Sequence, residues 1–179
     1  NEKTGIYAYG KFRGVEVRGM NTRTNINAAR VSYQWDDTFI LGSPIVVGVT
    51  YVEDNNGINE TLNEATITRP IQKGYGMDIG VPLAGDFLTA YGEYAKLENE
   101  YGGRGISAGV KGGYFDLFQY RLEYRVIGSR FAPGYFNSTY EATSFDFTED
   151  TVNKKIQGFL SEFSTTFMDG QIKAGAVFE

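Results

Sequence analysis

The stretch LFQYRLEYRVI, residues 117–127, decides the fold class. Every second position in it carries an aromatic or aliphatic side chain, namely Phe118, Tyr120, Leu122, Tyr124 and Val126. The positions between them carry polar or charged side chains, namely Gln119, Arg121, Glu123 and Arg125. Successive side chains of a strand point to opposite faces, so this period of two predicts a two-faced β-strand. In a helix the same apolar residues would wind around the whole cylinder.

Similar runs of about ten residues occur along the whole chain and predict about nine strands. They cover residues 5–18, 25–35, 44–53, 73–83, 86–98, 106–111, 117–127, 155–167 and 170 onward. The first run has a disruption near Gly10 to Gly14, and the faces of run 86–98 are ambiguous. The connections 53–72 and 129–154 are long and rich in Asn, Thr and Glu, whereas several others are short. Short turns at one end and longer loops at the other are typical of outer-membrane barrels.

Composition excludes several classes of function. The chain has 179 residues with no Cys and no His, so it has no disulfides, no thiol metal site and no histidine base. A net charge of -5 argues against a broad nucleic-acid-binding surface. Carboxylates near arginines are more simply ion-pair partners than catalytic pairs. We therefore predict no enzyme activity, no cofactor and no metal site.

Two patterns bear on export: a signal peptide at the N-terminus and an aromatic residue at the C-terminus. The longest apolar stretches, such as residues 45–49, are too short for a membrane-spanning helix, and no signal-peptide pattern is present. An exported protein would thus be represented here by its mature form or by a piece of it. The C-terminal Phe178 precedes Glu179, whereas many outer-membrane barrels end on an aromatic residue, which indicates an atypical end or a chain cut inside a strand.

The two predicted faces differ in a way that suits lipid on one side. Tyr is frequent on the apolar face, and aromatic residues at strand ends suit membrane interfaces. The opposite faces combine Gly and Ser with charges of both signs. In this pattern the chain resembles bacterial outer-membrane β-barrel proteins. The residues expected to face lipid or its interfaces are Tyr33, Trp35, Tyr51, Tyr75, Phe118, Tyr120, Tyr124 and Phe178.

The resemblance implies an all-β fold, an antiparallel up-and-down transmembrane β-barrel of about 8–10 strands. Residues 1–179 would form a single barrel domain or belong to a larger barrel, located in the bacterial outer membrane with the lipid bilayer as partner. Because single-chain bacterial barrels have even strand numbers, the count of nine indicates a missed strand, a split strand or an incomplete barrel.

Charged residues on the polar faces are the first candidate site. The residues expected to face the lumen are Arg30, Asp78, Glu93, Lys111, Arg121, Glu123, Arg125, Glu162 and Lys173. They would line a path for a small solute or form a salt-bridge network that fills the barrel. Five of them are basic and four acidic, so no ion selectivity follows.

An aromatic loop is the second candidate site. The segment from Ser129 contains a Pro-Gly turn flanked by aromatic side chains, and its candidate residues are Phe131, Pro133, Gly134, Tyr135 and Phe136. It would act as an extracellular recognition loop or a plug over the lumen, or else pack on its own aromatics at the barrel rim.

Three functions remain open from the sequence. The first is an outer-membrane β-barrel that acts as a structural or surface-interaction protein, or as a narrow passive channel with a charge-balanced lumen. The second is a segment of a larger porin-type transporter. The third is a soluble barrel similar to lipocalins that carries an apolar ligand, in which the apolar face would be the core.

Overall fold

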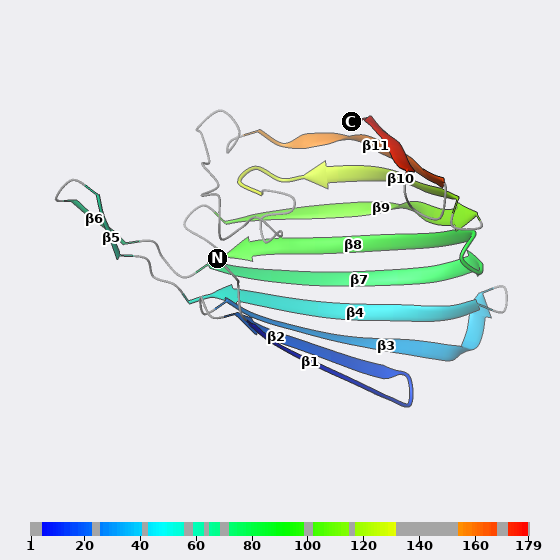
Figure 1. Ribbon diagram of the computed structural model, residues 1–179, viewed down its shortest axis with the longest axis horizontal. Coiled ribbons are helices and arrows are strands. Elements are labelled where there is room, and N and C mark those ends of the chain that lie inside the picture. Colours follow the sequence, from blue (N-terminus) through cyan, green and yellow to red (C-terminus); the bar gives the residue numbers. More distant parts are fainter. Residues whose placement is uncertain are drawn as a thin grey trace.

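Ten strands form one antiparallel sheet in the computed structural model of the chain (Figure 1). The structure describes residues 5–22, 26–40, 43–55, 59–62, 65–68, 72–98, 102–114, 117–131, 154–167 and 172–178. The strands of the sheet, in spatial order, are β1 (Gly5–Phe12), β2 (Val15–Thr22), β3 (Ile26–Ile40), β4 (Ser43–Asp54), β7 (Gln72–Ala84), β8 (Leu88–Glu98), β9 (Gly103–Tyr114), β10 (Phe118–Ile127), β11 (Ile156–Phe167) and β12 (Ile172–Phe178). The prediction of an all-β, antiparallel, up-and-down fold is confirmed.

The first predicted strand was wrong, because residues 5–18 contain a hairpin. Strands β1 and β2 are joined by Arg13 and Gly14, which both have positive φ, 45° and 80°. Such a two-residue turn matches the twist of the paired strands. Asn-Gly or Asp-Gly is its usual signal, and Arg13-Gly14 lacks it. This hairpin raises the predicted nine strands to the ten of the main sheet.

The predicted long connection 53–72 contains a second hairpin. Strands β5 (Asn59–Leu62) and β6 (Ala65–Thr68) pair with each other as a separate two-stranded sheet. In Figure 1 this hairpin extends away from the end of the ten-stranded sheet. The sequence gives it no clear alternation, which is why it was missed.

Both long connections lie at the same end of the sheet. At the right of Figure 1, which we call the turn end, strands are joined by two to four residues. The opposite end, the loop end, holds the connections 55–71 and 128–155 together with two short ones. No helix in the described part of the chain is long and apolar enough to cross a bilayer.

The sheet has two edges, β1 and β12, which lie at opposite sides of it in Figure 1. Within the described ranges they do not pair with each other, so the sheet is not closed. Trp35, expected at a strand end, is followed by strand up to Ile40. Regular pairing of β3 with β4 nevertheless stops at Trp35, where the register shifts.

The strand register defines two faces that agree with the predicted alternation. Tyr124 lies opposite Ala108 and Phe159, while Glu123 lies opposite Gly109 and Leu160. We call the face of Tyr124 the apolar face and that of Glu123 the polar face. The register also resolves the faces of β8, which places Tyr94 on the apolar face and Tyr91 and Glu93 on the polar face.

Candidate functional site

The apolar face is exposed across the whole sheet. Its large side chains include Val49, Met77, Ile106 and Leu122, which are all between 51% and 57% exposed. The eight predicted lipid-facing aromatics all lie on this face by register. Several pair across strands, as do Tyr124 and Phe159 with ring centroids 5.0 Å apart. This face consists mainly of aliphatic and aromatic side chains, yet no described segment covers it.

The polar face is the more buried of the two faces. All described residues that are buried belong to it, namely Ile26, Gly48, Asp54, Gly74, Tyr91, Leu97, Gly105, Glu123 and Leu160. Glu123 is only 4% exposed although it carries a charge. Burial of charge beside exposure of Leu and Phe is the reverse of what a water-soluble sheet shows.

Arg30 and Asp78 form the best-defined ion pair on the polar face. Arg30 on β3 reaches across β4 to Asp78 on β7, with Nη1–Oδ2 at 2.5 Å and Nη2–Oδ1 at 2.8 Å. Thr50 accepts a further hydrogen bond from Nη1 at 2.9 Å. The guanidinium lies over Gly48, whose missing side chain leaves the space it needs. A two-point contact of this kind fixes the geometry of both side chains.

Glu123 is the centre of a second cluster. Its carboxylate accepts hydrogen bonds from the hydroxyl of Tyr91 on β8 and from Nε of Arg125 on the same strand. The ammonium of Lys111 lies 5.0 Å from the centroid of the Tyr91 ring, within reach of a cation–π interaction. A buried carboxylate needs such partners because desolvation of an unpaired charge is costly.

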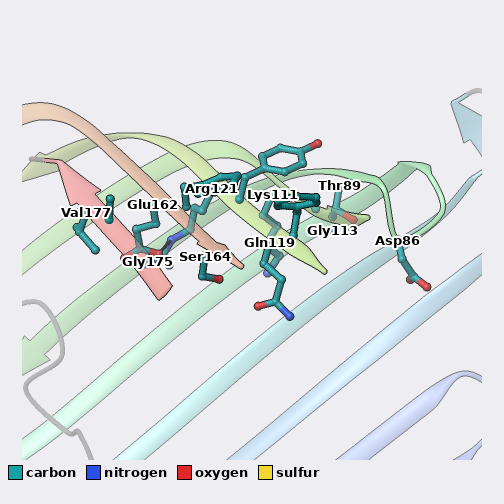
Figure 2. A pocket seen from close by; sticks show the side chains of 15 residues that line it. Asp86, Thr89, Lys111, Gly113, Gln119, Arg121, Glu162, Ser164, Gly175 and Val177 are labelled. Carbon is teal, nitrogen blue, oxygen red and sulfur yellow. Dashed lines mark hydrogen bonds and ion pairs between the residues drawn. The ribbon is translucent and has the colours of Figure 1, made fainter. Parts of the chain in front are cut away.

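A hollow of about 830 Å³ lies at the turn end of β8 to β12 (Figure 2). Arg121 and Glu162 cross part of it as an ion pair, with Nη2–Oε2 at 2.7 Å. Lys111, Gln119 and Ser164 add polar groups to its wall. Phe118 and Phe163 line the same hollow, so its wall is of mixed character, and its polar groups can form hydrogen bonds with water or small polar molecules. No group of three or more acidic side chains placed to hold a metal ion occurs among the described residues.

Phe131 is placed on the polar face, in contact with β9. A Cβ added at Gly105 would lie 2.7 Å from Cε1 of the Phe131 ring. The chain reaches this position through Gly128, whose N–H donates to the carbonyl of Arg104 at 2.8 Å. The start of the aromatic segment thus folds over the polar face. Pro133, Gly134, Tyr135 and Phe136 lie outside the described residues.

Five charged residues on the apolar face were missed by the sequence reasoning. They lie at the loop end of β4, β7, β8 and β9, and we call them the charged rim: Glu53, Lys73, Lys96, Glu98 and Arg104. Within this rim the carboxylate of Glu98 accepts hydrogen bonds from Lys96 Nζ at 2.5 Å and from Tyr75 Oη at 3.2 Å. The alternation that places Tyr51 and Tyr75 on the apolar face also places Glu53 and Lys73 there, so the signal was present for two of the five.

Every predicted lumen residue lies on the polar face by register. The structure brings seven of them into contacts: the Arg30–Asp78 pair, the Arg121–Glu162 pair, and Glu123 with Arg125 and, through Tyr91, Lys111. Glu93 lies on the same face and is exposed. Lys173 is placed by its register alone, opposite Thr166.

The β1–β2 hairpin adds polar-face charges that the sequence reasoning did not assign. Lys11 lies opposite Glu16, and Arg18 lies opposite Arg30. Arg18 pairs with Glu16, with Nε–Oε1 at 2.6 Å. They were missed because residues 5–18 were read as one strand.

Comparison of the chain with protein-family models, with curated proteins and with solved structures gives no match.

Proposed function

We propose that this chain forms the wall of a transmembrane β-barrel in a bacterial outer membrane. The observation that carries the proposal is the distribution of burial. Large apolar side chains are exposed on the apolar face, whereas every buried residue of the described part of the chain, including the charged Asp54 and Glu123, lies on the polar face. Lipid is the environment in which this arrangement is favourable, because it covers apolar side chains and leaves polar groups to a lumen. A soluble barrel of the lipocalin kind requires the opposite arrangement.

The height of the apolar face supports the same proposal. From Phe118 to Val126 the apolar positions of β10 extend about 27 Å along the strand, at about 3.4 Å per residue. A tilt of about 40° reduces this to about 20 Å, close to the apolar band of about 25 Å in outer-membrane barrels. The charged rim begins where this band ends. Connections of up to 28 residues at the loop end would then face the outside of the cell.

The two sheet edges favour a second candidate, a larger porin-type barrel of which these strands are one part. Unpaired N–H and C=O groups are not tolerated in lipid, so β1 and β12 require strand partners there. They lie at opposite edges of the sheet, and every residue of β1 is exposed. Additional strands supply those partners in a larger barrel, whereas curling of the sheet until β1 meets β12 supplies them in a ten-stranded one.

In either barrel we propose a passive role for the polar face. Its charges have both signs and most of them are in contact with an opposite charge, so the lumen wall is near neutral. Such a wall suits passive passage of small polar solutes, or a filled lumen in a protein that acts as an anchor. Conductance in a planar bilayer separates these two roles.

The decisive experiment is electrophoresis in SDS with and without boiling, after folding into detergent micelles. A membrane barrel is expected to migrate as a compact band that shifts after boiling. A chain that folds as a monomer in buffer without detergent and shows no shift would overturn the proposal and favour the soluble apolar-ligand carrier.

Introduced cysteines separate the two barrel sizes, because the chain has no Cys of its own. Ala8 on β1 and Ala176 on β12 are small residues of the apolar face. A disulfide between Ala8→Cys and either Ala174→Cys or Ala176→Cys would show direct pairing of β1 with β12 in a ten-stranded barrel. The larger barrel predicts that neither pair of cysteines cross-links within one molecule.

A further inference from the structure

The charged rim has an unusual position for a cluster of charges. It contains all the charged residues that strand pairing places on the apolar face, and they occupy four neighbouring strands. One row across the strands consists of Tyr51, Tyr75, Lys96 and Arg104. The next row toward the loop end consists of Glu53, Lys73 and Glu98.

We infer that the charged rim binds phosphate groups of outer-leaflet lipids, with Lys96 and Arg104 as the main contacts. This inference rests on the proposed membrane barrel, because only there does the apolar face meet lipid. It goes further by giving one part of that face a specific ligand.

Like charges directly opposite each other create the site. Lys96 on β8 lies opposite Arg104 on β9, at a separation where two cations repel. Glu98 neutralises Lys96 in part, at 2.5 Å. Arg104 is exposed and forms no ion pair with a described residue. An anion between the two cations removes the repulsion, and a guanidinium binds phosphate through two parallel hydrogen bonds.

The depth of this pair fits a lipid headgroup. The adjacent row on the inner side contains Met77, Tyr94 and Ile106, which are apolar or aromatic and exposed. Two residues along a strand correspond to about 7 Å, so Lys96 and Arg104 lie just outside the apolar band. Aromatic rings and basic side chains at this level are characteristic of the membrane–water interface. The rim is at the loop end, which corresponds to the outer leaflet.

Native mass spectrometry of the folded protein tests the inference. The protein is released from micelles that contain phosphatidic acid, and retained lipid is counted for wild type, K96Q/R104Q and K11Q/R18Q. K11Q/R18Q is the matched control, because it also removes one lysine and one arginine charge, but from the polar face of β1 and β2. We expect K96Q/R104Q to bind phosphatidic acid about thirtyfold more weakly, the loss expected for two cations near an anionic headgroup. K11Q/R18Q should bind as wild type does.

A charge-conserving variant and a competition with inorganic phosphate serve as controls. K96R/R104K keeps both charges and should retain the lipid, which separates a binding effect from a folding defect. Equal retention by wild type and K96Q/R104Q would overturn the inference, as would displacement of the lipid by inorganic phosphate, which would indicate a site for free anions. A protein that shifts on boiling but binds no lipid refutes this inference alone. One that never shifts refutes the membrane barrel as well.

Discussion

Replacement of Gly48 by alanine should break the ion pair between Arg30 and Asp78 while both charges remain. A Cβ at residue 48 would meet Nη2 of Arg30, lie 2.7 Å from its Cζ and lie 2.8 Å from Oδ2 of Asp78. Contacts this close do not persist, and the atoms in the way are the far ends of flexible side chains. The guanidinium therefore moves aside, and the backbone stays in place.

The magnitude follows from the contacts that are lost. Hydrogen bonds between charged groups contribute about 1.5–3 kcal/mol to stability. The side chains of Arg30 and Asp78 are 31% and 29% exposed, so solvent screening reduces this. We expect Gly48→Ala to lower the free energy of unfolding by about 1–2 kcal/mol. Gly158→Ala is the matched control, because a Cβ there meets nothing within 4 Å.

Urea unfolding in micelles, followed by the fluorescence of the single Trp, measures the effect. A double-mutant cycle with Arg30→Ala gives the sharper test. Once Arg30 is truncated, Gly48→Ala should have little further effect, so the two changes should couple by about 1–2 kcal/mol. Additive costs, or an unchanged midpoint for Gly48→Ala, would refute the arrangement of Arg30 over Gly48.

Three further predictions use the same unfolding assay. Leu122→Arg should destabilise a barrel in lipid by about 2–4 kcal/mol, whereas Gln119→Arg on the polar face should not; equal, small effects would contradict lipid contact. Glu123→Ala removes the buried carboxylate to which Arg125 donates, and should cost about 2–3 kcal/mol, with Glu123→Gln recovering part; a neutral result would show that the cluster contributes nothing. Gly109→Ala should lower the free energy of unfolding by about 1–3 kcal/mol, because its Cβ would meet backbone atoms of the neighbouring strand rather than a movable side chain. An effect no larger than that of Gly158→Ala would argue against this close approach.

Alternation predicted the faces well, because it is a local property of each strand. Arg121 and Tyr124 could be assigned to opposite faces without knowledge of their neighbours. The same holds for Phe159 and Glu162, although the alternation of that strand is weak. A period of two is imposed by the backbone itself, so it persists wherever a strand forms.

Pairing could not be predicted, because it depends on register. Nothing in the sequence relates Arg30 to Asp78, which lie 48 residues apart and are separated by a whole strand. The β1–β2 turn shows a related limit: positive φ at Arg13 is uncommon for a residue with a side chain and leaves no compositional mark. The charged rim shows a third limit, since the end of an apolar band is visible only when neighbouring strands are aligned.

The way in which charges are held on the polar face determines what kind of lumen the proposed barrel would have. Free charges of one sign would create a field along the wall and select ions by sign. Here Arg30 and Arg121 are each held by a carboxylate on another strand. The first pair links β3 to β7 and the second links β10 to β11, so each pair connects strands while it cancels charge on the wall. A solute would then be selected by the width of the lumen rather than by its charge. Phe131 lies over Gly105 beside the Glu123 cluster, where its ring would reduce that width.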